Sequence, residues 1–274
     1  MLAICTLAME PSFAITRADI IQSMRNLLTR ITINFLLGIG TFFFYSYAVT
    51  CEGKNVRIDK LTFTNTQTWS PRFLYWAENA VSVPEITLPA SPKNTSNNTK
   101  EDLTLMHAYQ DTRTEENIEE IKREINIYDA MFGQKSFAQL VDESSRPHTF
   151  ELMKDVIELE SPQIMKQKKI YNRVRPSYLD STLKPVIDIP PHPAYPSGHA
   201  TQAHLRALVL SELDPKHRDD YLQSAKRIAR NREVAGVHYP GDSKAGVILA
   251  EQLFTKLMNN SDFAEHLKEA KKEW

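Results

Sequence analysis

Apolar positions recur at helical spacing through most of the chain beyond residue 100. Ile118, Ile121, Ile125 and Tyr128 follow one another at steps of 3, 4 and 3, which places them on one face of an amphipathic helix. Similar spacing predicts further helices at roughly 136–142, 149–159, 162–173, 197–213, 216–235 and 243–258. Strand-like alternation is scarce. We therefore expect an all-α fold, with a single helical-bundle domain over residues 101–274 whose helices share one core.

The segment ahead of this domain lacks such periodicity. Residues 52–100 are polar, and the run "LPASPKNTSNNTKED" at their end is rich in Pro, Ser and Asn. That composition is typical of a loop, because these residues favour turns over regular elements. We expect residues 49–100 to form an irregular N-terminal arm.

An uncharged stretch precedes the arm. Residues 31–50 contain no charged side chain, two arginines lie just before them, and a Ser-Tyr-Ala sequence ends at Ala48. This combination is typical of a secretory leader. We expect residues 1–48 to be a signal peptide, with Met24 as the true start, and the cleaved protein to be periplasmic or secreted. As the alternative, an uncleaved leader would make residues 31–50 a membrane anchor.

The charge balance and the cysteine content limit which binding partners and which disulfides we expect. The chain carries 33 Lys and Arg against 34 Asp and Glu, so no global field attracts it to nucleic acid. Contact with a membrane is expected only if the leader is retained, and the oligomeric state is not indicated. Cys5 and Cys51 are the two cysteines, so a chain cleaved after Ala48 cannot form an internal disulfide.

Candidate chemistry begins in the run "KQKKIYNRVRP" at 166–176, which has five basic residues and no acid. Lys168 and Arg175 are seven positions apart, about two helical turns, so both are expected on the same side. Pro176 ends the predicted helix and favours an extended conformation at Arg175. The two cations are expected to converge on one multivalent anion.

A third cation lies where an apolar residue is expected. In the helix predicted at 216–235, the apolar stripe of Tyr221, Ala225 and Ile228 continues to position 232, which is arginine. A guanidinium on the inward face is costly unless it is paired or faces an anion. Arg232 is therefore expected either in a buried ion pair or at an anion site.

Two histidines complete the pattern. His238 is followed four positions later by Asp242, a carboxylate that can cap the next helix and can also orient the imidazole. In "HPAYPSGHATQ", Ser197 and Gly198 enter a predicted helix whose first turn contains His199. Free backbone N–H groups and the helix dipole favour an anion at such a position, where a histidine can give a proton to a leaving group.

Three blocks in this order, Lys-x6-Arg-Pro, Pro-Ser-Gly-His and Arg-x5-His-x3-Asp, resemble the motifs of the type 2 phosphatidic acid phosphatase superfamily. That superfamily includes class A bacterial non-specific acid phosphatases, membrane lipid phosphatases and vanadium-dependent haloperoxidases. The chain is most similar to the class A acid phosphatases, with looser similarity from the "LPASP" arm to the closing "DFAEHLKEAKKEW". The resemblance implies a helical bundle of the acid phosphatase/vanadium haloperoxidase type.

The resemblance also implies roles for individual residues. The phosphoryl oxygens would be held by Lys168, Arg175, Ser197, Gly198 and Arg232. The substrate would be a small phosphorylated molecule, and neither a metal nor another cofactor would take part.

By the same resemblance, His238 would be the nucleophile and would form a phosphohistidine. Asp242 would orient His238. His199 would protonate the leaving alcohol and then activate water. The family has Ser where this chain has Asn231, a supporting position, and Thr where it has Ala200.

Two alternatives follow from other branches of the superfamily. One is a membrane-associated phosphatase acting on lipids or lipid-linked pyrophosphates. The other is a haloperoxidase, for which vanadate would be the cofactor in the same pocket. His192 and His204 flank the second motif, and we expect loop or surface roles for them. Residues 130–150 and 177–195 are expected to form the pocket rim.

Overall fold

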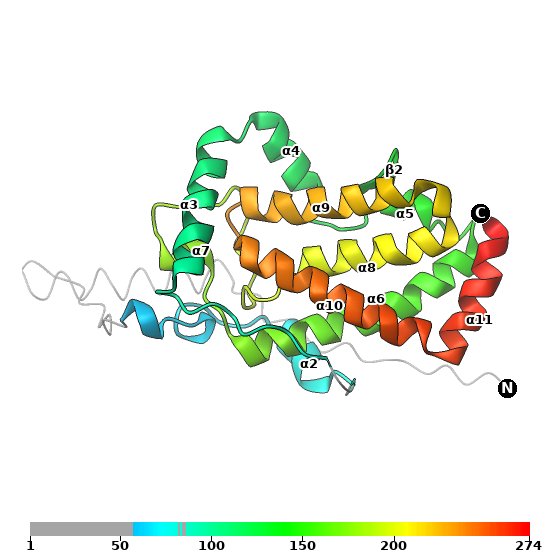
Figure 1. Ribbon diagram of the computed structural model, residues 1–274, viewed down its shortest axis with the longest axis horizontal. Coiled ribbons are helices and arrows are strands. Elements are labelled where there is room, and N and C mark those ends of the chain that lie inside the picture. Colours follow the sequence, from blue (N-terminus) through cyan, green and yellow to red (C-terminus); the bar gives the residue numbers. More distant parts are fainter. Residues whose placement is uncertain (1–56, 82, 84–85) are drawn as a thin grey trace, which may run out of the picture. The chain divides into compact units, whose positions relative to one another are not determined.

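The computed structural model describes residues 57–81, 83 and 86–274 (Figure 1). The predicted leader, its cleavage after Ala48, the anchor at 31–50 and both cysteines lie outside the described residues. Within the described part of the chain, no helix is both long and apolar enough to cross a membrane.

The described residues are mostly helical, which confirms the predicted fold class. The α-helices are α2 (Pro71–Asn79), α3 (Asn97–Thr112), α4 (Glu115–Arg123), α5 (Phe137–Leu140), α6 (Pro147–Tyr171), α7 (Pro176–Leu179), α8 (Gly198–Leu213), α9 (Arg218–Val234), α10 (Pro240–Met258) and α11 (Ser261–Ala270). Short 3-10 helices are η1 (Ile58–Lys60), η2 (Phe63–Asn65), η3 (Pro215–His217) and η4 (Lys271–Glu273). Strands β1 (Met131–Phe132) and β2 (Lys135–Ser136) pair antiparallel, with Met131 opposite Ser136.

Helix α8 lies in the middle of the bundle, packed against α9, α10 and α6 (Figure 1). Its sequence, GHATQAHLRALVLSEL, is apolar or small on nearly every side, and eleven of its sixteen residues are buried. A helix that is apolar all round is stable only where neighbours cover each face. One end of the bundle contains the N-termini of α8 and α10 together with the C-terminus of α9 (Figure 1).

Two predicted helices, 149–159 and 162–173, are one continuous helix in the structure. Pro162 lies inside α6 without ending it. A proline removes one backbone hydrogen bond, but α6 buries residues on both sides of this position against α2, α8 and α11, and this packing maintains the helix. The helix ends at Tyr171, because Asn172 takes the left-handed conformation (φ 47°, ψ 34°) of a C-terminal cap.

The helix predicted to include Ile118 and Tyr128 is shorter than its apolar spacing indicates. α4 starts after Thr114, whose side chain accepts a hydrogen bond from the Asn117 amide, and it ends at Arg123. Ile125 and Tyr128 lie in the turns that follow, and Ile125 is 55% exposed. The chain thus leaves helical geometry at Glu124, in a segment that reaches the second motif.

The predicted arm is only partly irregular. Residues 71–79 form α2, which packs along α6, and α3 begins at Asn97, within the polar run. The described residues between these helices are irregular and are held by side chains of the bundle. The Tyr171 hydroxyl donates to the Leu88 carbonyl (2.9 Å). The Thr87 amide donates to Gln252, and the Gln252 amide donates back to the Thr87 carbonyl.

Candidate active site

The three motifs come together at one end of the bundle. They lie at the end of α6 and the segment after it, at the N-terminus of α8, and across the C-terminus of α9 and the N-terminus of α10. Figure 1 shows these ends of α8, α9 and α10 side by side, near α3 and α7. The Ser197 amide donates to the Asp242 carbonyl (3.0 Å), which joins the second motif directly to the third.

His238 is 3% exposed and has a partner at each ring nitrogen. Its Nδ1 lies 3.2 Å from Asp242 Oδ2, and its Nε2 lies 3.1 Å from Arg175 Nη1. Since a guanidinium only donates, Nε2 accepts and Nδ1–H donates to the carboxylate. Burial and the nearby Arg175 charge hold the pKa of His238 well below its usual range. The imidazole is therefore neutral, with its lone pair on Nε2.

Asp242 forms an ion pair with Arg173, a residue that sequence analysis did not place in the site. Arg173 Nη1 lies 2.6 Å from Asp242 Oδ1, and both side chains are almost fully buried. Burial by itself would raise the pKa of Asp242, but Arg173 and His238 lower it to about 2. The carboxylate stays ionised and keeps the proton of His238 on Nδ1.

Arg175 is fully buried, and main-chain and histidine acceptors surround its guanidinium. It donates to the carbonyl oxygens of His192 (2.8 and 3.0 Å) and Val237 (2.7 Å), and it contacts His238. Its Nη2 also lies 3.0 Å from His192 Nδ1. His192 lies in a loop, as one of its two expected roles had it, but not at the surface: the ring is buried, meets Phe73 edge to face, and contacts Arg175.

Lys168 is also fully buried. Its Nζ donates to the carbonyl oxygens of Pro193 (2.9 Å), Ala194 (3.2 Å) and Pro196. Burial, and secondarily the charge of Arg175, lower its pKa well below the usual value. The three N–H groups of the ammonium are thus occupied by the loop that leads into α8, and Lys168 fixes that loop.

Lys168 and Arg175 do converge, but not through helical spacing. The helix ends at Tyr171, and Arg175 has the extended conformation expected before Pro176 (φ −71°, ψ 150°). The expectation that both project from one helix is therefore wrong. They meet because the chain turns at Asn172 and both side chains then bind the loop at 192–196.

Ser197 caps α8, with its hydroxyl oxygen accepting from the Ala200 amide (3.4 Å). The amides of Gly198 and His199 lie in the first turn of α8, where helix geometry provides them with no intrahelical acceptor. The N-terminus of α8 therefore offers the donors that sequence analysis predicted for an anion.

His199 is half-buried and directs Nε2 at two carbonyl oxygens, those of Glu124 (3.1 Å) and Ile125 (3.2 Å). Nε2 must carry the proton, because carbonyl oxygens only accept. Nδ1 is then the nitrogen that can exchange a proton with a ligand. Burial, assisted by the charge of Arg232, lowers the pKa of His199 to about 3.

Arg232 has the buried ion pair that was one of its two expected settings. It is 1% exposed, and its Nη2 donates to the Ile121 carbonyl (3.0 Å) and to Glu124 Oε2 (3.2 Å). Its Nε and Nη1 have no hydrogen-bond partner among the described residues. One edge of the guanidinium is thus in a buried ion pair, and the other edge has two unsatisfied donors, as an oxyanion requires.

The assembled site has buried positive charge and a neutral imidazole. Arg175 contacts the imidazole, the charge of Lys168 acts on it, and the α8 N-terminus adds the positive end of a helix dipole. Among the described residues, no three His, Cys, Asp or Glu side chains are grouped as metal ligands. The arrangement can bind a tetrahedral oxyanion and bring His238 Nε2 to its central atom.

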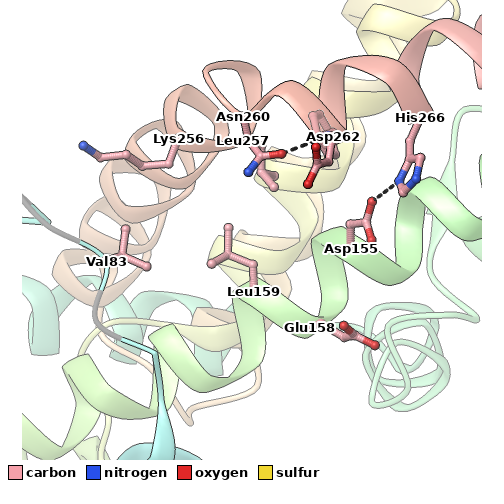
Figure 2. A pocket seen from close by; sticks show the side chains of 10 residues that line it. Val83, Asp155, Glu158, Leu159, Lys256, Leu257, Asn260, Asp262 and His266 are labelled. Atoms are coloured by element: carbon pink, nitrogen blue, oxygen red, sulfur yellow. Dashed lines mark hydrogen bonds and ion pairs between the residues drawn. The ribbon is translucent and has the colours of Figure 1, made fainter.

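A cavity elsewhere in the bundle contains no motif residue. It has a volume of about 470 Å³, and Figure 2 shows α6, α10 and α11 around it. His266 Nδ1 and Asp155 Oδ2 form an ion pair at its edge (2.6 Å). The other lining residues are Val83, Glu158, Leu159, Lys256, Leu257, Asn260, Asp262 and Phe263. Its mixed lining has none of the converging cations of the motif site.

Known proteins with similar sequences or folds are the next comparison. No family model matches the chain. The chain is 33% identical over 138 residues to an acid phosphatase of Zymomonas mobilis, covering 48% of this chain and 52% of that protein. It is 28% identical over 145 residues to a non-specific acid phosphatase of Providencia stuartii, covering 51% and 58%. The chain therefore spans little more than half the length of these curated relatives.

A solved structure, that of a bacterial vanadium-dependent iodoperoxidase, has the same fold. It superposes with a TM-score of 0.54 at 18% identity, over 73% of this chain and 61% of that one. The motifs, the fold and the sequence matches give one conclusion. The chain is similar to bacterial non-specific acid phosphatases, in keeping with the type 2 phosphatidic acid phosphatase/vanadium haloperoxidase superfamily that its motifs resemble, and it shares the fold of the iodoperoxidase.

Proposed function

We propose that this protein is a periplasmic or secreted acid phosphatase that hydrolyses small phosphate monoesters through a phosphohistidine, without a metal ion. The observation that carries the proposal is the state of His238. Its ring is neutral, its Nδ1 proton is held by Asp242, and its Nε2 lone pair lies among buried cations. A nucleophile in that environment suits an anionic electrophile whose charge the cations offset.

In the first step, the phosphoryl group binds against the free edge of Arg232 and the α8 N-terminus. Arg175 transfers its Nη1–H bond from His238 Nε2 to a phosphoryl oxygen, which frees the lone pair. His238 Nε2 forms a bond to phosphorus as the bond from phosphorus to the ester oxygen breaks. Protonated His199 gives its Nδ1 proton to the departing oxygen, so the product leaves as an alcohol.

His199 must gain that proton although burial and Arg232 lower its pKa in the empty site. A bound phosphate monoester offsets the charge of Arg232 and so raises the pKa of His199. A substrate monoanion can also supply the proton itself. This requirement favours turnover at acid pH.

In the second step, His199 Nδ1 takes a proton from a water molecule that attacks the phosphohistidine. The new phosphorus–oxygen bond forms as the bond from phosphorus to His238 Nε2 breaks. Inorganic phosphate leaves, and His238 is again neutral with its proton on Nδ1. Asp242 stabilises the positive charge that the ring carries while it is phosphorylated.

The test is a substrate panel on the purified full chain, comprising an aryl phosphate, nucleotides, sugar phosphates and phosphatidate, with EDTA present. We expect release of phosphate from the small monoesters that is insensitive to EDTA and absent in His238→Ala. Vanadate should inhibit this release. Loss of activity with EDTA, an unchanged rate in His238→Ala, or preference for phosphatidate would contradict the proposal.

Location needs a separate experiment because the leader lies outside the described residues. Expression in a Gram-negative host, followed by osmotic shock, should release the protein with a new N-terminus at residue 49. Retention in the membrane pellet at full length would instead indicate an anchor.

A further inference from the structure

A polar cluster behind the anion site includes a residue that no motif contains. Glu124 lies just after α4, and its carboxyl group is buried against the C-terminal part of α9. Arg227, Asn231 and Arg232 approach it from that helix. Glu120, one turn earlier on α4, contacts Arg227 and Asn231 but does not hydrogen-bond with Arg232 or His199.

Glu124 contacts two groups of the proposed mechanism through two different parts of the residue. Its Oε2 accepts from Arg232 Nη2 (3.2 Å) and from Asn231 Nδ2 (2.9 Å). Its main-chain carbonyl accepts from His199 Nε2 (3.1 Å). The residue therefore joins the phosphate-binding arginine to the acid–base histidine.

The contact with Arg232 determines which donors the guanidinium offers to a ligand. The guanidinium is planar, so holding Nη2 against Glu124 and the Ile121 carbonyl turns Nε and Nη1 the other way. Those two donors are buried and have no partner in the described part of the chain. A shift of Glu124 would rotate them out of register with a phosphoryl group.

Asn231 fixes Glu124 in turn. This residue replaces the serine expected by resemblance, and its longer amide donates to both Glu124 Oε2 and Glu120 Oε2 (3.1 Å). A serine hydroxyl has one hydrogen and could not donate to two carboxylates at once. With asparagine at this position, one side chain of α9 therefore hydrogen-bonds to two carboxylates, that of Glu120 in α4 and that of Glu124 just after it.

We propose that Glu124, held by Asn231, is a positioning residue that sets Arg232 for the phosphoryl group and His199 for the leaving group. This inference rests on the proposed phosphatase function. Glu124 touches neither substrate nor product, and it acts through the two residues that do.

The first test compares Glu124→Gln with Glu120→Gln as the matched control on the same helical segment. Phosphate affinity is measured by the thermal shift that inorganic phosphate induces, and kcat and KM are measured with an aryl phosphate. We expect Glu124→Gln to weaken phosphate binding and lower kcat/KM by at least about tenfold, since the neutral amide loses the charge that pairs with Arg232 and cannot accept from Arg232 and from Arg227 at its two ends at once. Glu120→Gln should change both by less than about twofold. Equal effects in the two variants would overturn the inference.

A double-mutant cycle separates positioning from general destabilisation. In an Arg232→Ala background, Glu124→Gln should have little further effect on phosphate affinity, because the residue it acts through is absent. A loss as large as in the wild-type background would show that Glu124 acts on the fold alone, and would overturn the inference.

Asn231 gives an independent variant that keeps the buried carboxylate. Asn231→Ala should weaken phosphate binding in the same direction as Glu124→Gln but less, and the two losses should not add. Additive losses would contradict the proposed tie between the residues. If the wild type bound phosphate but released none from any ester, the phosphatase proposal would fail, while the phosphate-affinity comparisons would still test Glu124.

Discussion

Arg173 and Asp242 form a buried ion pair behind the nucleophile, with 2.6 Å between Nη1 and Oδ1. The Arg173 guanidinium also stacks on the ring of Tyr239, 3.8 Å from its centroid, and its Nη2 donates to Thr99 in α3. Arg173, which pairs with the carboxylate that orients His238, is therefore itself held by Tyr239 and Thr99. The nucleophile depends on a chain of contacts that reaches α3.

Removing Arg173 should affect both stability and turnover. Arg173→Met leaves Asp242 as a buried carboxylate without its ion-pair partner, which costs about 3–5 kcal/mol of unfolding free energy. Urea unfolding measures this loss, and kcat should fall because His238 loses its fixed orientation. Lys169→Met is the control, since its exposed pair with Glu78 contributes no more than about 1 kcal/mol. Similar losses of unfolding free energy in the two variants would show that the buried Arg173–Asp242 pair stabilises the fold no more than an exposed pair does.

Variants of the two histidines that we propose as catalytic, His199 and His238, should be blocked at different steps of the reaction. With an aryl phosphate, whose leaving group needs little protonation, His199→Ala should still form the phosphohistidine but hydrolyse it slowly. Rapid quenching into alkali should then trap labelled enzyme. His238→Ala should trap none and should lose at least the roughly 10²–10⁴-fold expected for a proton-transfer group. Labelled protein in His238→Ala would place the phosphoryl group on another residue.

Gly246 should be intolerant of a side chain because α8 and α10 approach closely there. A Cβ at this position would come within 2.8 Å of the Ser197 carbonyl oxygen and 2.9 Å of Ala200 Cβ. Gly246→Ala should therefore cost about 1–3 kcal/mol by overpacking, measured by urea unfolding, and should displace the α8 N-terminus.

The control for this prediction is Gly198→Ala at the same helix end. A Cβ there would meet its nearest atom, Ile164 Cγ2, at an ordinary 3.7 Å. Its unfolding free energy should stay near that of the wild type. A stable Gly246→Ala protein would mean that the two helices can separate without cost.

The ligand-free protein should lose stability as the solution is acidified. Burial lowers the pKa of His192, His199 and His238 below the usual 6.5, to about 3 for His199. Below about pH 6.5 the unfolded chain therefore binds more protons than the folded one. Each such histidine lowers the unfolding free energy by up to about 1.4 kcal/mol per pH unit. Thermal unfolding from pH 7 to 4 measures the slope, which added phosphate should reduce.

His266 provides a control of opposite sign. Its hydrogen bond to Asp155 raises its pKa, so its contribution to stability is present at low pH and is lost as the pH rises through that value. His266→Gln should leave the acid-side slope unchanged, whereas His238→Gln should reduce it. An unchanged slope in His238→Gln would mean that the buried ring takes up a proton in the folded state.

Sequence reasoning could group the residues that we propose for anion binding because motif spacing is local information. His238 and Asp242 are four residues apart, and Ser197 to His199 are consecutive, so their geometry follows from one turn of helix. It missed Arg173, because which of the five basic residues at 166–176 reach the site depends on the chain reversal at Asn172. It missed Glu124 because that residue is more than seventy positions from the motifs it joins.

The helices were predicted well where the apolar stripe is buried and poorly where other contacts stabilise them. α8, α9 and α10 lie within a few residues of their predicted bounds. α2 is short and α3 is polar, and both pack against longer helices: α2 against α6, and α3 against α9 and α10. At α4, apolar residues continue the helical spacing beyond Arg123 although the backbone does not, because the segment turns towards His199.

The two tyrosine hydroxyls that face the irregular segment have a consequence for any shortened version of the protein. Tyr195, next to the motif loop, donates to the Pro89 carbonyl (2.7 Å), and Tyr171 donates to that of Leu88. A polypeptide begun at residue 101 would contain every motif yet lack both acceptors. Recombinant versions should therefore retain the sequence from residue 57 onward, because the loop that presents Ser197 is braced by residues more than a hundred positions upstream.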